Sequence, residues 1–150
     1  GDVYKRQGQK NRFLLVALTP KGWAGEKESI DNLEEEGSFN ATSTLWVLGN
    51  YSRFIRPGYH RISMTLNESM SFFGSAWMSP QQDCIVAVYT NLSSKGIRLN
   101  ETRQNWGGEP KTIKTYTTSG TKQLVEKVVQ EGDPVVLDAE SVTTVVYELK

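Results

Sequence analysis

The sequence predicts a mostly β protein: an antiparallel β-sandwich of seven or eight strands, preceded by one strand and one helix. Three observations support this fold class. After Gly58, short segments rich in β-branched and aromatic residues recur about every ten residues. Turn-forming residues separate these segments. Before Gly58 the chain has instead one apolar run and one stretch of helical periodicity, so the composition changes there.

The first expected strand is the apolar run Phe13–Leu18, FLLVAL, which Thr19 and Pro20 close. A continuous apolar run suits a strand covered on both faces, as in a parallel sheet, and a short buried helix is the alternative. Residues 21 to 40 are polar and rich in glycine and glutamate, and this composition predicts a long loop.

A helix is expected over Ala41–Ile55, because apolar residues recur there at intervals of three and four. Pro57 lacks a backbone donor and Gly58 allows a tight turn, so together they end the helix. Three residues can cap its first turn through a side-chain oxygen: Asn40, Thr42 and Ser43.

The sandwich strands are expected in the second part of the chain. They are Tyr59–Leu66, Ser71–Met78, Ile85–Tyr89, Gly96–Leu99, Thr112–Thr118, Leu124–Val129, Val135–Leu137 and Val142–Leu149. The last of them is almost wholly apolar or β-branched. It should therefore be central in its sheet or well covered.

Composition excludes several classes of protein. The 150 residues include 17 Lys and Arg against 17 Asp and Glu, which gives no electrostatic reason to expect nucleic acid or a membrane surface as partner. The single cysteine, Cys84, rules out an intramolecular disulfide, and the single histidine, His60, argues against a zinc site. We expect neither metal nor cofactor.

The polar leader, residues 1 to 10, has no periodicity that joins it to the apolar run after it. We interpret it as foreign to the fold or disordered, and expect the natural protein to extend upstream of Asn11.

The run Leu48–Ile62, LGNYSRFIRPGYHRI, carries a specific resemblance. It is similar to the junction between the last barrel helix and the β-sandwich in glycoside hydrolase family 30. It looks most like the endo-β-1,6-galactanase branch, in which an ALTP-like strand end, here Ala17–Pro20, and a long loop come before this run. Segments Ala87–Leu92 and Ser141–Leu149 also resemble sandwich strands of the family.

The resemblance implies a C-terminal fragment of a larger enzyme. Such enzymes are retaining hydrolases whose two catalytic glutamates lie at the ends of the fourth and seventh strands of a (β/α)8 barrel. Residues 11–57 would be the last strand, loop and helix of that barrel, truncated, and residues 58–150 the sandwich packed on it. Both glutamates would then be absent, so no catalytic residue is assigned and the fragment is expected to be inactive.

The intact enzyme would cleave β-linked galactan or a related plant polysaccharide, bound through the missing barrel. It would be secreted, periplasmic or on the cell surface. One departure is that the family tends to have tryptophans in the eighth strand, whereas this chain has Arg12–Leu15. The alternative is an autonomous carbohydrate-binding or adhesion sandwich, although such a module would not need the strand, the helix and the fifteen-residue junction.

Two tryptophans are candidate substrate contacts. Trp23 follows the first strand, where α/β barrels place their substrate loops, and Trp106 precedes Gly107 and Gly108 in an expected exposed loop. The alternative for each tryptophan is an ordinary structural role, in the core or on the surface, without contact to substrate. The domain junction is assigned to five residues at the helix end: Arg53, Phe54, Ile55, Arg56 and Pro57. The two arginines suit the carbonyls of a helix C-terminus, or are only surface charges.

Other polar residues carry no clear signature. Glu101 and Glu109 lie near turns, and no pair of carboxylates has the placement that retaining hydrolysis needs. Cys84 is expected to be a buried, inert thiol. Five Asn-x-Ser/Thr sequons occur, and the one inside the expected helix should be coincidental: Asn40, Asn50, Asn67, Asn91 and Asn100.

Overall fold

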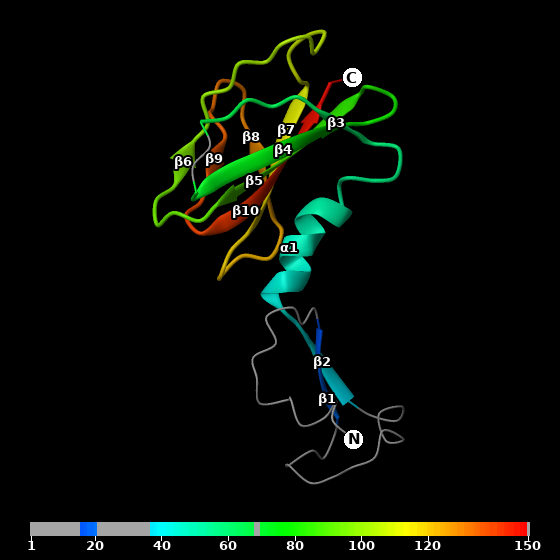
Figure 1. Ribbon diagram of the computed structural model, residues 1–150, viewed down its shortest axis with the longest axis vertical. Coiled ribbons are helices and arrows are strands. Elements are labelled where there is room, and N and C mark those ends of the chain that lie inside the picture. Colours follow the sequence, from blue (N-terminus) through cyan, green and yellow to red (C-terminus); the bar gives the residue numbers. More distant parts are fainter. Residues whose placement is uncertain (1–15, 21–36, 68–69, 150) are drawn as a thin grey trace. The chain divides into compact units, whose positions relative to one another are not determined.

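The computed structural model describes residues 16–20, 37–67 and 70–149, with side chains described from residue 41 onward (Figure 1). The chain divides into two compact units, Gly1–Leu45 and Trp46–Lys150. Each unit is described by itself.

In the first unit, β1 (Val16–Pro20) pairs with β2 (Gly37–Ala41) in an antiparallel ladder that sets Val16 opposite Ala41. The expectation that the loop continues to residue 40 is therefore wrong. The apolar run suggested a strand of a parallel sheet, whereas within this chain its described part has an antiparallel partner, β2. The sequence of β2, GSFNA, has few residues typical of strands, so its pattern did not predict it. Residues 13–15 lie outside the described part.

The helix α1 spans Ser43–Ser52 and is shorter at both ends than expected. Its start is later because Ala41 belongs to β2, which leaves Thr42 at the cap position, with its carbonyl 3.1 Å from the amide of Leu45. After Ser52 one more turn is stabilised by the Ile55 amide, which donates to the Tyr51 carbonyl at 2.8 Å. Gly58 has a φ of 93°, a left-handed conformation that glycine adopts at little cost, and it ends this turn.

The second unit is built on a six-stranded sheet, all of whose pairings are antiparallel. In spatial order its strands are β3 (His60–Ile62), β4 (Phe72–Met78), β5 (Cys84–Asn91), β10 (Ser141–Glu148), β7 (Thr112–Thr118) and β8 (Val125–Val129). A two-stranded sheet joins β6 (Ile97–Arg98) to β9 (Val136–Leu137). The antiparallel β-sandwich is confirmed, with all eight expected strands present and the first of them paired over only three residues.

The strand β10 lies between β5 and β7 and pairs with both along its length (Figure 1). Five of its eight residues are buried, and Val145 has no exposed surface. The expectation that this strand is central is confirmed. Its apolar and β-branched composition follows from that position, because side chains on both faces are covered.

The hydrophobic core lies on one face of the six-stranded sheet. Side chains of alternate residues, such as Ala87, Val145 and Tyr147, point to this face. Leu137 of the small sheet and Val135, just before that sheet, pack against them. The opposite face carries the other alternation, including Trp77 and Tyr116, and receives α1. One face of the large sheet is therefore covered by the small sheet and the other by α1.

Candidate functional site

The end of α1 packs on the sheet through aromatic contacts. Phe54 lies against Tyr116, with ring centroids 4.4 Å apart, and the Arg53 guanidinium lies over both rings at 5.4 and 5.5 Å. Arg56 Nη1 donates to the Ser52 carbonyl at 3.0 Å, which is the contact with a helix C-terminal carbonyl expected from the sequence. Arg53 instead stabilises the helix end by cation–π contact.

A buried asparagine joins α1 to two strands. Asn50 has no exposed surface, and its Nδ2 donates to Thr118 Oγ1 at 2.7 Å and to the Trp46 carbonyl at 3.0 Å. Thr144 Oγ1 donates to the Asn50 main-chain oxygen at 2.6 Å. Every polar atom of the Asn50 side chain is thus satisfied, because Oδ1 also accepts from Thr144 at 3.0 Å. The sequon at Asn50 is coincidental, as expected.

Burial also argues against the sequon at Asn91, whose side chain is fully buried and donates to the carbonyls of Lys95 and Asp138 at 2.8 Å each. A glycan needs that nitrogen at the surface. Asn67 and Asn100 are exposed.

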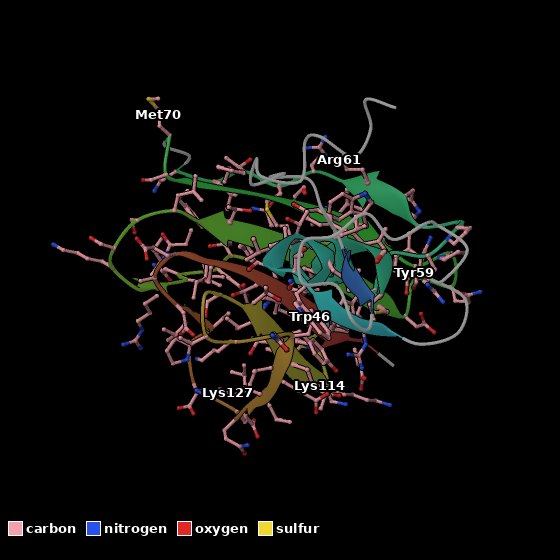
Figure 2. The ribbon with its side chains drawn as sticks, turned by 90° about the horizontal axis from the view of Figure 1, so that it is seen from below. Trp46, Tyr59, Arg61, Met70, Lys114 and Lys127 are labelled. Atoms are coloured by element: carbon pink, nitrogen blue, oxygen red, sulfur yellow. The ribbon has the colours of Figure 1, made fainter. Side chains whose placement is uncertain are left out.

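The four tryptophans of the chain are Trp23 and Trp106, the two candidate substrate contacts, together with Trp46 and Trp77. Trp23 is outside the described residues, so its expected contact stays a prediction. Trp106 is half-buried rather than fully exposed, and its ring meets Tyr147 edge to face, with centroids 5.0 Å apart and planes at 70°. Trp77 lies on the opposite face of the sheet, edge to face with Tyr51 at 6.0 Å. Trp46, seen in Figure 2, has a buried indole nitrogen with no hydrogen-bond partner.

A polar cluster surrounds Trp106. The Tyr147 hydroxyl donates to Glu101 Oε1, and Arg103 donates to Glu101 Oε2 from Nη2 at 3.0 Å. Arg103 Nη1 also donates to Glu109 Oε2 at 2.6 Å, and the guanidinium lies 5.6 Å from the centre of the Trp106 ring. Sequence reasoning missed this cluster because its members are brought together by the register of β10, which is far along the chain from Glu101.

Two buried tyrosines extend the cluster into the core. Burial, the largest cause, raises the pKa of the Tyr147 hydroxyl well above its usual value, and neighbouring Tyr89 and Glu101 raise it further. Burial likewise raises the pKa of Tyr89, with a contribution from Glu101. The Tyr147 hydroxyl therefore stays protonated well into the alkaline range and donates its hydrogen bond to Glu101.

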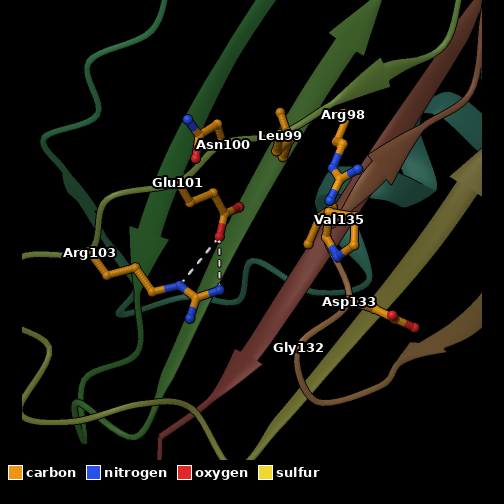
Figure 3. Close-up of a pocket in the computed structure, with 9 residues that line it drawn as sticks. Arg98, Leu99, Asn100, Glu101, Arg103, Gly132, Asp133 and Val135 are labelled. Carbon is orange, nitrogen blue, oxygen red and sulfur yellow. Dashed lines mark hydrogen bonds and ion pairs between the residues drawn. The ribbon is translucent and has the colours of Figure 1, made fainter.

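Two cavities lie beside the chain segment Arg98–Arg103. One of about 490 Å³ lies between this segment and the turn Gly132–Val135 (Figure 3). The other, of about 450 Å³, lies between this segment and Ile62–Leu66, with apolar core residues at its base and Trp106 in its wall. Glu101 and Arg103 line both cavities, so the polar cluster separates two hollows.

The cluster is not arranged as the acid and nucleophile of a glycosidase. A retaining mechanism needs two carboxylates about 5 Å apart with the glycosidic bond between them. Glu101 and Glu109 instead both bind the Arg103 guanidinium, so each carboxylate is already engaged in an ion pair. The geometry suits binding, in which fixed polar and aromatic side chains contact a ligand.

The described residues hold no group of three or more His, Cys, Asp and Glu side chains that could bind a metal ion. In the same part of the chain no helix has the length and apolar character needed to cross a membrane. Cys84 begins β5 and is half-buried rather than buried as expected, and burial raises the pKa of its thiol.

The antiparallel sandwich with a helix packed on its sheet matches the fold of the C-terminal domain of family 30 glycoside hydrolases. The chain is 29% identical over 102 residues to the glucuronoxylanase XynC of Bacillus subtilis (strain 168), covering 68% of this chain and 23% of that protein. A second Bacillus subtilis glucuronoxylanase XynC is 29% identical over 130 residues, 84% of this chain and 29% of that protein.

Solved structures agree with this relationship. A family 30 endoxylanase from Clostridium papyrosolvens C71 has a TM-score of 0.62 and 26% identity, covering 72% of this chain and 28% of that one. A conserved exported protein from Bacteroides fragilis shares the fold, with a TM-score of 0.71 at 24% identity over 89% of this chain and 26% of that one. No protein-family model matches.

The expected resemblance to glycoside hydrolase family 30 is confirmed: homologues and structural neighbours of this chain are family 30 xylanases, which match it over their C-terminal part. The chain spans 23% and 29% of the length of the two curated relatives, so it corresponds to about a quarter of such an enzyme.

Proposed function

We propose that this chain is the C-terminal part of a retaining glycoside hydrolase, in which residues 58–150 form a sandwich that supports a catalytic (β/α)8 barrel. The observation that carries the proposal is the match to the C-terminal part of family 30 enzymes. Residues 11–57 would then be the last strand, loop and helix of that barrel. The leader, residues 1–10, would lie outside both.

The contacts of α1 agree with a sandwich that holds the barrel in place. A helix that ends a barrel must transmit its position to the next domain, and here Asn50 and Phe54 fix α1 to the sheet through hydrogen bonds and ring packing. The junction residues Arg53 to Pro57 lie at the exit of this helix. Their proposed role is to hold the angle between barrel and sandwich.

The proposed substrate is β-linked galactan or a related plant polysaccharide. The run Leu48–Ile62 supports galactan, whereas the relatives are named as xylanases, which makes xylan the competing substrate. Trp23 is proposed to contact the polysaccharide from the loop after the last barrel strand. A secreted location is proposed too, in keeping with the neighbour described as an exported protein of Bacteroides fragilis.

The full-length protein encoded by the gene tests this proposal. Purified enzyme is incubated with β-1,6-galactan, glucuronoxylan and, as a control, starch, and reducing sugars and products are measured. Release from galactan alone supports the galactanase branch, and release from xylan alone replaces galactan by xylan. An upstream sequence without a barrel, or no release from either β-linked polymer, would contradict the hydrolase proposal.

The chain studied alone is proposed to be inactive, because no pair of carboxylates with the placement that retaining hydrolysis needs stands out in its sequence, and Glu101 and Glu109 are both paired with Arg103. Incubation of this chain with both polymers should give no reducing sugar above that of a boiled sample. Release that disappears in Glu101→Gln or Glu109→Gln would overturn this.

The second candidate is an autonomous carbohydrate-binding sandwich, and one observation favours it. The cavity beside Trp106 belongs entirely to the second unit, so this unit could bind a glycan without any barrel.

A further inference from the structure

We propose that the cavity between Ile62–Leu66 and Leu99–Trp106 is a saccharide-binding site of the sandwich, separate from any catalytic barrel. Its ligand is a neutral β-linked oligosaccharide of two or three sugar units. The size of the cavity is the first argument, since about 450 Å³ falls in the range of about 300–1,000 Å³ that is usual for small-molecule sites.

The wall of the cavity has the chemistry that sugars need. A pyranose ring has an apolar face, which packs on an aromatic ring, and an edge of hydroxyl groups, which need hydrogen-bond partners. Trp106 is half exposed and lines the cavity, and Glu101 and Arg103 line it beside the indole. Rim residues Asn100, Thr102 and Gln104 are exposed and offer further amides and a hydroxyl.

These groups are held in place before any ligand arrives, which lowers the entropic cost of binding. Tyr147 is almost fully buried and fixes Glu101 through its hydroxyl, while its ring packs against the edge of Trp106. Arg103 is tied to both Glu101 and Glu109 and lies over the indole. A cluster with this many internal contacts presents one fixed surface to the cavity.

The backbone around Trp106 adds a second sign of a built site. Asn105 has a φ of 62°, and Gly107 and Gly108 have φ values of 77° and 149°, so three residues beside the tryptophan leave the usual backbone regions. No heavy atom lies within 4 Å of a Cβ built on either glycine. Backbone conformation, rather than lack of space, therefore requires glycine there, and this conformation places the indole in the cavity wall.

The charges select a neutral ligand. The cluster holds two carboxyl side chains against one guanidinium, which already binds both, so an anionic sugar would meet an unfavourable field. Hydroxyl groups, in contrast, can donate to the free lone pairs of Glu101. The apolar side of the cavity, formed by the half-buried Ile62, Met64 and Leu66, suits a sugar face rather than a charged group.

The test uses this chain labelled with ¹⁵N, in which each of the four tryptophans gives one indole signal. Trp106→Phe assigns the Trp106 signal. Xylotetraose, β-1,6-galactotetraose and maltotetraose are titrated up to about 10 mM, a range that detects dissociation constants near 1 mM. We expect the Trp106 signal to shift in saturable fashion with one β-linked sugar, and Trp77 on the opposite face to stay unchanged.

Variants locate the site. Trp106→Ala should weaken binding at least tenfold. The two single rim variants Asn100→Ala and Gln104→Ala remove only exposed side chains. Each should weaken binding several-fold without changing the melting temperature. Trp77→Phe is the matched control and should bind as the parent chain does. Absence of any saturable shift, or shifts that centre on Trp77, would overturn the proposal and leave the cavity to another occupant, such as an extended polypeptide segment. Because no turnover is measured, this result is independent of the hydrolase proposal.

Discussion

The side-chain amide of Asn50 donates a hydrogen bond to Thr118 Oγ1 at 2.7 Å, which links a helix to a strand 68 residues further along the chain. Both residues are buried, and Thr144 of the neighbouring strand completes the arrangement by donating to Asn50. One asparagine therefore holds α1 against β7 and β10 at once. Apolar packing alone would let the helix slide along the sheet, because dispersion contacts have little directional preference.

Replacing this residue should be costly. Asn50→Ala removes the buried side-chain hydrogen bonds of Asn50 with Thr118 and Thr144 and leaves a cavity under the helix, and we expect the free energy of unfolding to fall by about 2–3 kcal/mol. Urea denaturation monitored by circular dichroism measures the change. Asn67→Ala, at an exposed position, is the control and should change stability by less than about 0.5 kcal/mol. Equal effects of the two substitutions would show that Asn50 is not the anchor of the helix.

The two arginines at the helix end make different contacts, so their contributions can be separated. Arg56→Ala removes a hydrogen bond to the Ser52 carbonyl, and Arg53→Ala removes a cation–π contact with Phe54 and Tyr116. Both arginines are solvent-exposed, and we expect a loss of about 0.5–1 kcal/mol per substitution. Thermal unfolding measures it, with Arg61→Ala on the exposed edge strand β3 as control. A double variant as stable as the control would reduce both residues to surface charge.

Alkaline pH should destabilise the sandwich through its buried tyrosines. Burial raises the pKa of Tyr116 from 10.0 to about 12, and a hydrogen bond to Glu126 adds to the shift. Because the folded pKa exceeds the unfolded one, this contribution is complete below pH 10 and is lost as pH rises from 10 to 12, by up to about 1.4 kcal/mol per pH unit.

Tyr116→Phe cannot titrate, so its stability should fall less steeply than that of the parent chain above pH 10. Denaturation series at pH 7, 10 and 11 give both slopes, and the pH 7 series serves as the internal control. Parallel slopes between pH 10 and 11 would contradict the burial of an un-ionised Tyr116 hydroxyl.

Hydrogen exchange should distinguish the centre of the large sheet from its edge. The amides of β10 are paired on both sides, whereas β8 pairs only with β7 and most of its residues are exposed. Amides of Val142–Tyr147 should therefore exchange slowest, close to the rate of global unfolding, and those of Glu126–Val128 orders of magnitude faster. Mass spectrometry of peptic fragments measures both segments in one sample. Equal protection in the two would mean that a further strand covers β8.

The sequence predicted the strands well because alternation and turn residues are local signals. All eight strands after Gly58 were found from such signals, and the apolar pattern of Val142–Leu149 even indicated its central place. The partner β2 was not found, since its glycine and polar residues lack strand propensity and its pairing depends on β1. Family resemblance, rather than periodicity, supplied the link to glycoside hydrolases.

The candidate site was less predictable. The sequence indicated Trp106 but not its contacts with Glu101, Arg103 and Tyr147, because Tyr147 comes from a separate segment that only the folded sheet brings beside them. In the sequence, Asn50 stands out only as a coincidental sequon inside the expected helix. No local pattern marks a polar side chain whose partners, Thr118 and Thr144, lie 68 and 94 residues away.

The position of β10 also has a consequence for biosynthesis. Among the strands of the large sheet it is the last to be translated, yet it is the one that connects β3, β4 and β5 with β7 and β8. Until Ser141–Glu148 has left the ribosome, the nascent chain holds two separate strand groups, each with an unpaired inner edge. Such edges invite pairing with other chains, so we expect the risk of aggregation during synthesis to fall when β10 closes the sheet.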